Sequence, residues 1–241
     1  MINLTPRQTQ ILKAIIEEYM ETASPVGSEI LDKKYNLGAS PATIRNEMVV
    51  LTKNGFLNQT HTSSGRVPTP IAFKFYVREL MKEQELSVTD EVAVKGKIWD
   101  YKQKIDKLLH EATRVLSERT KSLALATTEE GDIYHSGYAN ILDYPEFFDI
   151  DVTRELFSFI DDFKQLNKIF FNQALGEDPI HILLGSEIGN QFLEPCGMIF
   201  THFHTNKISG SLGVIGSYRL KYPIIIPTLR YLTKLIEQIG E

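Results

Sequence analysis

The sequence predicts an α+β protein in which a helical N-terminal part precedes a body of mixed strands and helices. Two observations lead to this prediction. In residues 1–80 apolar side chains recur at helical spacing after three hydroxyl–proline pairs. In residues 120–241 segments typical of strands alternate with helical ones. We divide the chain into residues 1–82, a linking segment at 83–119 and the body at 120–241.

The composition predicts a folded chain whose charge is unevenly distributed. With 241 residues, of which 42% are apolar, the chain can bury a core. Its net charge is −5, yet residues 1–80 hold nine Lys and Arg against seven Asp and Glu. A single cysteine, Cys196, excludes an internal disulfide framework, and the sequence shows neither a signal-peptide pattern nor ~18 consecutive apolar residues. We therefore expect a cytoplasmic protein that does not span a membrane.

Three hydroxyl–proline pairs mark helix starts in the N-terminal part. They are Thr5-Pro6, Ser40-Pro41 and Thr69-Pro70, and a hydroxyl N-cap before proline favours the first helical turn. Gln8 stands three residues after Thr5, which predicts a capping box. The first helix is expected to run to about Glu21 along an apolar stripe.

A second and a third helix are expected before residue 54. Ser28 is predicted to cap the second helix, which ends near Tyr35. The third helix has Ile44, Met48 and Leu51 at spacing i, i+4, i+7, so this face is expected to be buried. The opposite face carries small and polar residues, namely Ala42, Asn46, Val49 and Lys53, with Arg45 at its flank.

The outer face of the third helix carries groups suited to nucleic acid. Asn pairs with adenine and Arg with guanine through two hydrogen bonds each. We predict that Thr43, Arg45 and Asn46 contact base edges. Ser40, at the helix N-terminus, is expected to hold a phosphate. The alternative is an ordinary three-helix bundle whose third helix is only solvated, and residues 1–54 alone do not decide between the two.

The residues after the third helix favour the nucleic-acid interpretation. Phe56–Thr60 alternates like a strand, and His61–Arg66 is a polar loop with a glycine and a cation at its tip. Helix, turn, helix, strand and basic hairpin is the order of a winged helix-turn-helix, which places one helix in the DNA major groove. Ser63, Ser64 and Arg66 are therefore expected to bind phosphates.

These stretches resemble the HrcA family of heat-inducible transcription repressors. The resemblance rests on five segments: Leu4–Gln8, Pro25–Ser28, Ala42–Met48, His61–Thr69 and Phe75–Val77. One departure follows the hairpin, where Pro70-Ile71-Ala72 replaces a polar turn that contains glycine. Proline at a helix start keeps the geometry, so the departure does not weaken the resemblance.

A linking helix is expected to follow. Its apolar residues alternate at spacings of four and three over three heptads: Val94, Ile98, Tyr101, Ile105, Leu108, Ala112 and Val115. This pattern is typical of a coiled coil, in which Ile98, Tyr101, Ile105 and Leu108 would form a dimerisation helix. A helix that packs on its own body domain explains the pattern equally well, because three heptads are the minimum for a coiled-coil prediction.

The body is predicted to be a mixed α/β domain. Strands are expected at 123–127, 133–138, 180–184, 198–204 and 208–215, with helices at 152–166, capped by Asp151, and at 224–239. The family resemblance continues through Gly137–Leu142, Pro145–Phe147, Gly210–Gly216 and Arg219–Tyr222. It implies a GAF-like regulatory and dimerising domain. The domain is shortened, because the stretch between the first body strand and Gly137 is largely missing.

No catalytic, cofactor or metal site is predicted. His202 and His204 share one face of a strand, with Cys196 and His181 nearby, but no second pair with ligand spacing accompanies them. Gly210–Gly213 lacks the lysine of a phosphate-binding loop. An enzyme is therefore not expected.

The resemblance implies a repressor that binds double-stranded DNA as a homodimer, at an inverted repeat upstream of chaperone genes. It also implies a protein partner, the chaperonin GroEL, which assists the repressor to its DNA-binding form. Two alternatives remain open. One is a winged-helix regulator that senses a small molecule in its GAF-like domain. The other is a protein-interaction adaptor that keeps the winged fold without binding DNA, which the acidic overall charge allows.

Overall fold

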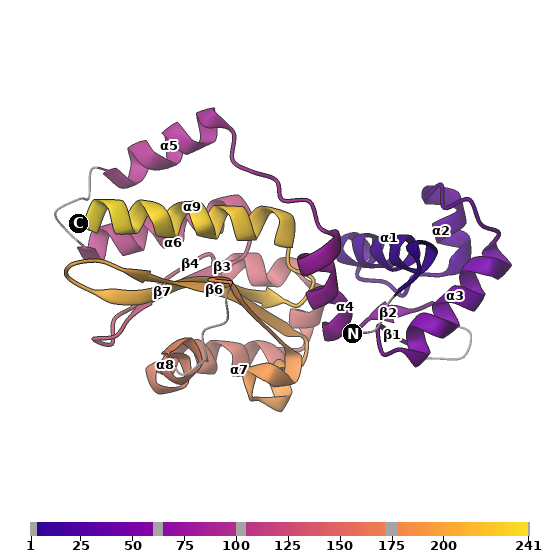
Figure 1. Ribbon diagram of the computed structural model, residues 1–241. Helices are drawn as coiled ribbons and strands as arrows, with labels where there is room; N and C mark the ends of the chain where they lie inside the picture. Colours follow the sequence, from indigo (N-terminus) through magenta and orange to yellow (C-terminus); the bar gives the residue numbers. More distant parts are fainter. Residues whose placement is uncertain (1–3, 60–64, 100–104, 172–177, 241) are drawn as a thin grey trace. The chain divides into compact units, whose positions relative to one another are not determined.

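Two compact units make up the computed structural model, which describes residues 4–59, 65–99, 105–171 and 178–240. The first unit is Met1–Lys82 and the second is Glu83–Glu241. Figure 1 shows their helices and strands. Within the described ranges, no helix combines the length and the apolar character needed to cross a membrane.

The first unit is helical with one small sheet. Its elements are α1 (Pro6–Thr22), α2 (Ser28–Lys34), α3 (Pro41–Lys53), β1 (Leu57–Asn58), β2 (Val67–Pro68), α4 (Pro70–Phe75) and the π-helical turn η1 (Tyr76–Leu80). The three predicted helix starts are confirmed: the hydroxyls of Thr5, Ser40 and Thr69 each accept the backbone N–H three residues on. The capping box of Thr5 with Gln8 is also present. Ser28 begins α2 but does not cap it, because Gly27 holds the extended cap position.

A single core joins the helices of the first unit. The predicted face of α3 is buried, with Ile44, Met48 and Leu51 at most 3% exposed. It packs against α1 and α2, where Ile15 and Leu31 are also fully buried. Burying these aliphatic side chains fixes how α3 is rotated about its axis. The rotation decides which residues of α3 face solvent.

The second unit is built on a five-stranded antiparallel sheet in the order β4-β3-β7-β6-β5. Its strands are β3 (Leu123–Thr128), β4 (Ile133–Ser136), β5 (His181–Leu184), β6 (Cys196–His204) and β7 (Ser209–Ser217). Its helices are α5 (Val88–Trp99), α6 (Ile105–Thr120), α7 (Ile150–Asp161), α8 (Phe163–Phe171) and α9 (Tyr222–Gly240). Four short 3₁₀ turns connect them: η2 (Tyr138–Asp143), η3 (Pro145–Phe148), η4 (Gly185–Ile188) and η5 (Gln191–Leu193). The mixed α/β prediction is confirmed, and the architecture fits the GAF-like expectation.

Helices cover both faces of this sheet. Figure 1 shows α6 and α9 on one face, α5 outside them, and α7 and α8 on the other face. Side chains alternate along β3, so that Leu123 and Leu125 join the core with α7 and α8. Ala124 and Ala126 therefore face α6, where a small side chain allows the helix to approach closely.

Three details of the body differ from the sequence prediction. The helix expected at 152–166 is divided into α7 and α8, because the carboxylate of Asp162 accepts the backbone N–H groups of Lys164 and Gln165 and so starts a new helix. The cap of α7 is Asp149 and not Asp151. The second strand ends at Ser136, since Gly137 has a φ of 91° and turns the chain into η2.

The continuous linking helix predicted from the heptad pattern is wrong. Two helices, α5 and α6, take its place, and α5 packs back on the C-terminal end of α6, where Lys97 pairs with Glu118 at 3.0 Å and Asp90 with Arg119 at 3.2 Å. Ile98 and Leu108 are buried within the second unit and Ile105 is half-buried, while Tyr101 lies outside the described residues. A heptad pattern records only that one face is apolar, and here that face packs on the helix's own unit. The dimerisation role assigned to these four residues stays a prediction.

Candidate nucleic-acid interface

The N-terminus of α3 is held by two hydroxyls. Ser40 has an extended backbone, with φ −65° and ψ 156°, and its Oγ accepts the backbone N–H of Thr43 at 3.2 Å. The two hydroxyl oxygens, Ser40 Oγ and Thr43 Oγ1, lie 3.0 Å apart. Pro41 occupies the first helical position, where its missing N–H costs no hydrogen bond. The structure therefore brings two of the predicted contact residues together at the positive end of the helix dipole.

The outer face of α3 carries Arg45 and Asn46, both exposed. They are adjacent in sequence and point away from the buried face formed by Ile44 and Met48. A guanidinium with five donors and a side-chain amide can each form two parallel hydrogen bonds with a base edge. The same face also exposes apolar side chains, since Val49 is 38% exposed. This mixture can contact both polar base edges and a thymine methyl group.

Polar contacts from α1 and α2 hold the helices around α3. Gln8 Nε2 donates to Glu47 Oε2 at 3.0 Å, which joins the first turn of α1 to α3. Glu18 is buried and accepts from Lys34 Nζ at 2.6 Å and from the Tyr35 hydroxyl at 3.2 Å, which joins α1 to the end of α2. Burial, and the negative charge of Glu18, raise the pKa of Tyr35 well above its ordinary value. The Tyr35 hydroxyl donates to this carboxylate and so joins the end of α2 to α1.

The strand that returns from the hairpin is fixed to the rest of the unit by Arg66. The backbone of Arg66 exchanges two hydrogen bonds with that of Val26, at 2.9 and 2.8 Å. Its side chain is half-buried, and Nε donates to Thr52 Oγ1 near the end of α3 at 3.2 Å. Gly65 lies so close to Val26 that a Cβ there would come within 2.5 Å of the Val26 carbonyl. Close backbone approach therefore explains the glycine before Arg66.

The predicted phosphate-binding residues are only partly described. Ser63 and Ser64 lie outside the described residues. Arg66 was predicted to project from the tip of the hairpin, whereas its Nε is bonded to Thr52. Sequence reasoning missed Thr52, because a threonine near the end of a helix has no sequence signal that ties it to an arginine 14 residues later.

The histidines of the second unit form a small aromatic group. The rings of His181 and His202 lie 5.2 Å apart, and His202 Nδ1 is hydrogen-bonded to Ser211 Oγ at 2.9 Å. Burial lowers the pKa of His202 to about 4, and the charges of His181 and His204 act in the same direction. In the described part of the chain no three His, Cys, Asp or Glu side chains are arranged to hold a metal ion.

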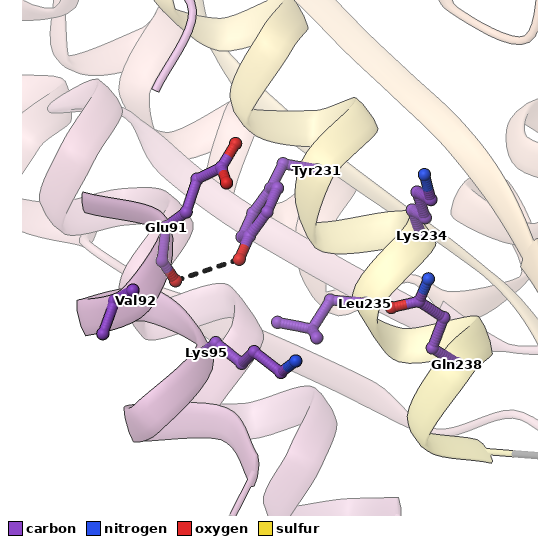
Figure 2. Close-up of a pocket in the computed structure, with 7 residues that line it drawn as sticks. All are labelled: Glu91, Val92, Lys95, Tyr231, Lys234, Leu235 and Gln238. Atoms are coloured by element: carbon purple, nitrogen blue, oxygen red, sulfur yellow. Dashed lines mark hydrogen bonds between the residues drawn. The ribbon is translucent and has the colours of Figure 1, made fainter. Parts of the chain in front are cut away.

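A cleft of about 430 Å³ lies between α5 and α9 in the second unit. Figure 2 shows its lining: Glu91, Val92 and Lys95 from α5, with Tyr231, Lys234, Leu235 and Gln238 from α9. The cleft could not be predicted from the sequence, because the two helices are more than 120 residues apart in the chain.

Comparison with known proteins gives a family match over most of the chain. The profile of a family described as "HrcA protein C terminal domain" matches residues 48–226. A protein of Carboxydothermus hydrogenoformans named heat-inducible transcription repressor HrcA is 25% identical over 334 aligned positions, which cover 97% of each chain. A protein of the same name from Clostridium acetobutylicum is 46% identical over 121 residues, which is 50% of this chain and 35% of the relative.

Two further comparisons concern length and fold. A repressor of the same name from Pelotomaculum thermopropionicum aligns over 341 positions that cover 100% of this chain and 98% of its own. Since this chain has 241 residues, it lacks about 100 positions that such relatives contain. A solved structure described as a hypothetical protein at 2.2 Å resolution superposes with a TM-score of 0.81 at 20% identity, covering 99% of each chain. At that identity the similarity supports the fold alone.

Proposed function

Because this chain belongs to the HrcA family, we propose that it represses transcription of heat-shock genes by binding DNA through its first unit. One observation carries the proposal. The helix α3 is capped at Ser40, held by a buried face, and leaves Arg45 and Asn46 exposed next to each other. A rigid helix that presents a guanidinium and an amide is the arrangement that reads base edges in the major groove.

The elements around α3 support a winged helix-turn-helix at residues 1–82. The helices α1, α2 and α3 precede the antiparallel pair β1–β2, in which Leu57 is opposite Pro68. An isolated antiparallel bridge joins Val26 to Arg66, the residue directly before β2. The connection between β1 and β2 is then proposed as the wing, and the described residue Arg66 that follows it is bonded to Thr52 near the end of α3.

We propose the following contacts with DNA. Thr43, Arg45 and Asn46 read bases, and Ser40 binds a phosphate at the positive end of α3. Ser63 and Ser64 are proposed to contact phosphates from the wing, with Arg66 positioning the wing as well as meeting the backbone. The second unit, with α5 and α6, is proposed as the regulatory and dimerising part.

We further propose that the repressor binds an inverted repeat as a dimer and responds to the chaperonin GroEL. Two-fold symmetry in the protein matches two half-sites separated by whole turns of DNA. The chaperonin is proposed as the partner that assists folding to the DNA-binding form, as the family resemblance of the sequence implies. Sedimentation of the chain with and without operator DNA measures whether it forms a dimer. The fraction of chain that binds operator after refolding, with and without GroEL, measures whether the chaperonin assists folding.

The test of base reading is Arg45→Ala, compared with Arg78→Ala as a control. Arg78 is an exposed arginine of the same unit that lies outside α3 and pairs with Glu79, so the two variants lose the same charge. Fluorescence anisotropy on a chaperone-promoter inverted repeat is expected to show that Arg45→Ala loses about 1–3 kcal/mol of specific binding. Arg78→Ala is expected to change the affinity for operator DNA and for scrambled DNA by the same factor.

Discrimination between operator and scrambled duplex is the decisive quantity. If Arg45→Ala weakens both duplexes equally, Arg45 contacts phosphate only, and base reading by this residue is wrong. If neither variant changes binding, α3 is not the recognition helix.

A further inference from the structure

We propose that the cleft between α5 and α9 binds a small amphipathic organic anion, a carboxylate or sulfonate on an apolar body. The cleft has a volume of about 430 Å³ and is lined by seven side chains from two helices of the second unit. A volume of this size is within the range of pockets that hold small organic ligands. The proposal does not depend on DNA binding by the first unit.

The apolar part of the cleft lies between Leu235 and Val92. Leu235 belongs to α9 and is 3% exposed, so it forms a firm floor. Val92 belongs to α5 and is 67% exposed, so a ligand between the two would remove a large apolar side chain from water. Figure 2 shows Val92 on α5 and Leu235 on α9, with Tyr231 one turn from Leu235 on the same helix. The Tyr231 hydroxyl donates to the Glu91 backbone carbonyl at 2.9 Å and links α9 to α5.

The polar part of the cleft favours a negative charge. Lys95 lines the cleft from α5 and Lys234 lines it from α9, and the Gln238 amide adds further donors. Glu91 is the one carboxylate in the lining, against two ammonium groups. The Tyr231 hydroxyl donates its hydrogen to the Glu91 carbonyl, so the donors left for an anion are the two ammonium groups and the Gln238 amide.

The two lysines of the cleft lack the partners that neighbouring charges have. Lys97, Arg119 and Arg230 are paired with Glu118, Asp90 and Glu83. Over the described ranges, neither Lys95 nor Lys234 has an ion-pair partner. The Lys95 ammonium lies 4.8 Å from the centre of the Trp99 ring, which leaves it able to approach an anion. A carboxylate bound in the cleft would supply a negative charge to Lys95 and Lys234.

Binding is tested with 8-anilinonaphthalene-1-sulfonate, an amphipathic anion that fluoresces when bound, titrated into the full chain. The proposal predicts saturable binding at one site per chain, displaced by octanoate. The double variant Lys95→Ala/Lys234→Ala is expected to weaken binding roughly tenfold or more, because hydrogen bonds to charged groups are lost. Val92→Trp, at an exposed position, is expected to fill the cleft and abolish binding.

Two controls separate this site from general binding to charged or apolar surfaces. Lys164→Ala/Lys168→Ala removes the same charge from α8, where both lysines are exposed, and should leave the affinity unchanged. Phe148→Ser removes a side chain that is 73% exposed outside the cleft, and should also leave it unchanged. The probe should raise the melting temperature of the wild type and not that of the double variant.

Three results overturn the proposal. The first is the absence of saturable binding, and the second is binding that the α5 and α9 variants leave unchanged while their circular dichroism stays that of the wild type. The third is a dimer that forms without ligand and dissociates in Val92→Trp, because a second copy would then occupy the cleft.

Discussion

Removing the guanidinium of Arg219 should destabilise the second unit strongly, because it leaves a largely buried carboxylate without its cation. Arg219 lies between β7 and α9 and binds Glu146 of η3 through two hydrogen bonds, at 2.6 and 2.9 Å. Ser217 Oγ donates to the same carboxylate at 2.8 Å. The side chains of Arg219 and Glu146 are 5% and 16% exposed. The pair therefore ties a 3₁₀ turn on one side of the sheet to the start of α9.

The expected loss for Arg219→Met is about 3 kcal/mol. Breaking a buried ion pair by removing one partner costs about 3–5 kcal/mol, while replacing both partners by apolar residues is often neutral. Glu146 keeps the Ser217 hydroxyl and some access to water, so the lower end of the range applies. The double variant Glu146→Leu/Arg219→Met should recover most of the loss.

Urea unfolding followed by the fluorescence of Trp99 measures this loss in the correct unit. Trp99 is the single tryptophan of the chain and lies in α5 of the second unit. At an m-value of about 2 kcal/mol/M, a loss of 3 kcal/mol lowers the midpoint by about 1.5 M. A loss below about 1 kcal/mol for Arg219→Met, or a double variant no more stable than the single one, would refute the reasoning.

The pH dependence gives the same prediction a second readout. Burial acts to raise the pKa of Glu146, but the hydrogen bonds from Arg219 and Ser217 and the positive charge outweigh it, so the pKa lies below its ordinary value of 4.5. A carboxyl whose pKa is lower in the folded state stabilises the fold above pH 4.5 and loses this effect as pH falls through the folded pKa. The wild type should therefore lose more stability than the double variant below pH 4.5.

Three further predictions concern both units. Ser40→Ala removes the cap of α3 and should lower the stability of the first unit by about 1 kcal/mol in urea unfolding, whereas Ser40→Asp should retain most of it. Gly137→Ala should lower the stability of the second unit by more than about 1 kcal/mol, because φ is 91° and a Cβ would clash with Ser117 Oγ. A melting temperature equal to that of the wild type would contradict this. Burial, with two neighbouring histidines, lowers the pKa of His202 from 6.5 to about 4, so the unfolded chain takes up the proton first and stability should fall from pH 6.5 to 4. If the stability of His202→Gln falls with pH as steeply as that of the wild type, His202 is not the cause of the fall.

Helix caps and buried helix faces could be predicted from the sequence because they depend on residues close together in the chain. The caps at Thr5, Ser40 and Thr69 were predicted since a hydroxyl and the N–H it accepts are only three residues apart. The buried face of α3 followed from its spacing alone. The break at Asp162 had the same kind of local signal, an acidic residue able to cap a new helix, but the apolar periodicity continues across it and hid the break.

Contacts between elements far apart in the chain could not be predicted from the sequence. The heptad spacing of residues 94–115 indicates an apolar face without naming its partner, and that partner proved to be the second unit itself. The bond from Arg66 to Thr52 and the cleft at Tyr231 both join residues that only the fold brings together. The proposed base-reading role of Arg45 and Asn46 rests on their exposure, which the sequence predicted by placing Ile44 and Met48 inside.

The most direct test of the proposed function is the anisotropy of the full chain on a chaperone-promoter inverted repeat and on a scrambled duplex of equal length, at two salt concentrations. A sequence-specific repressor should prefer the repeat by roughly 10³-fold or more at both salt concentrations. Equal affinity for the two duplexes, falling together as salt rises, would mean that the first unit contacts only phosphates and would contradict operator reading by α3.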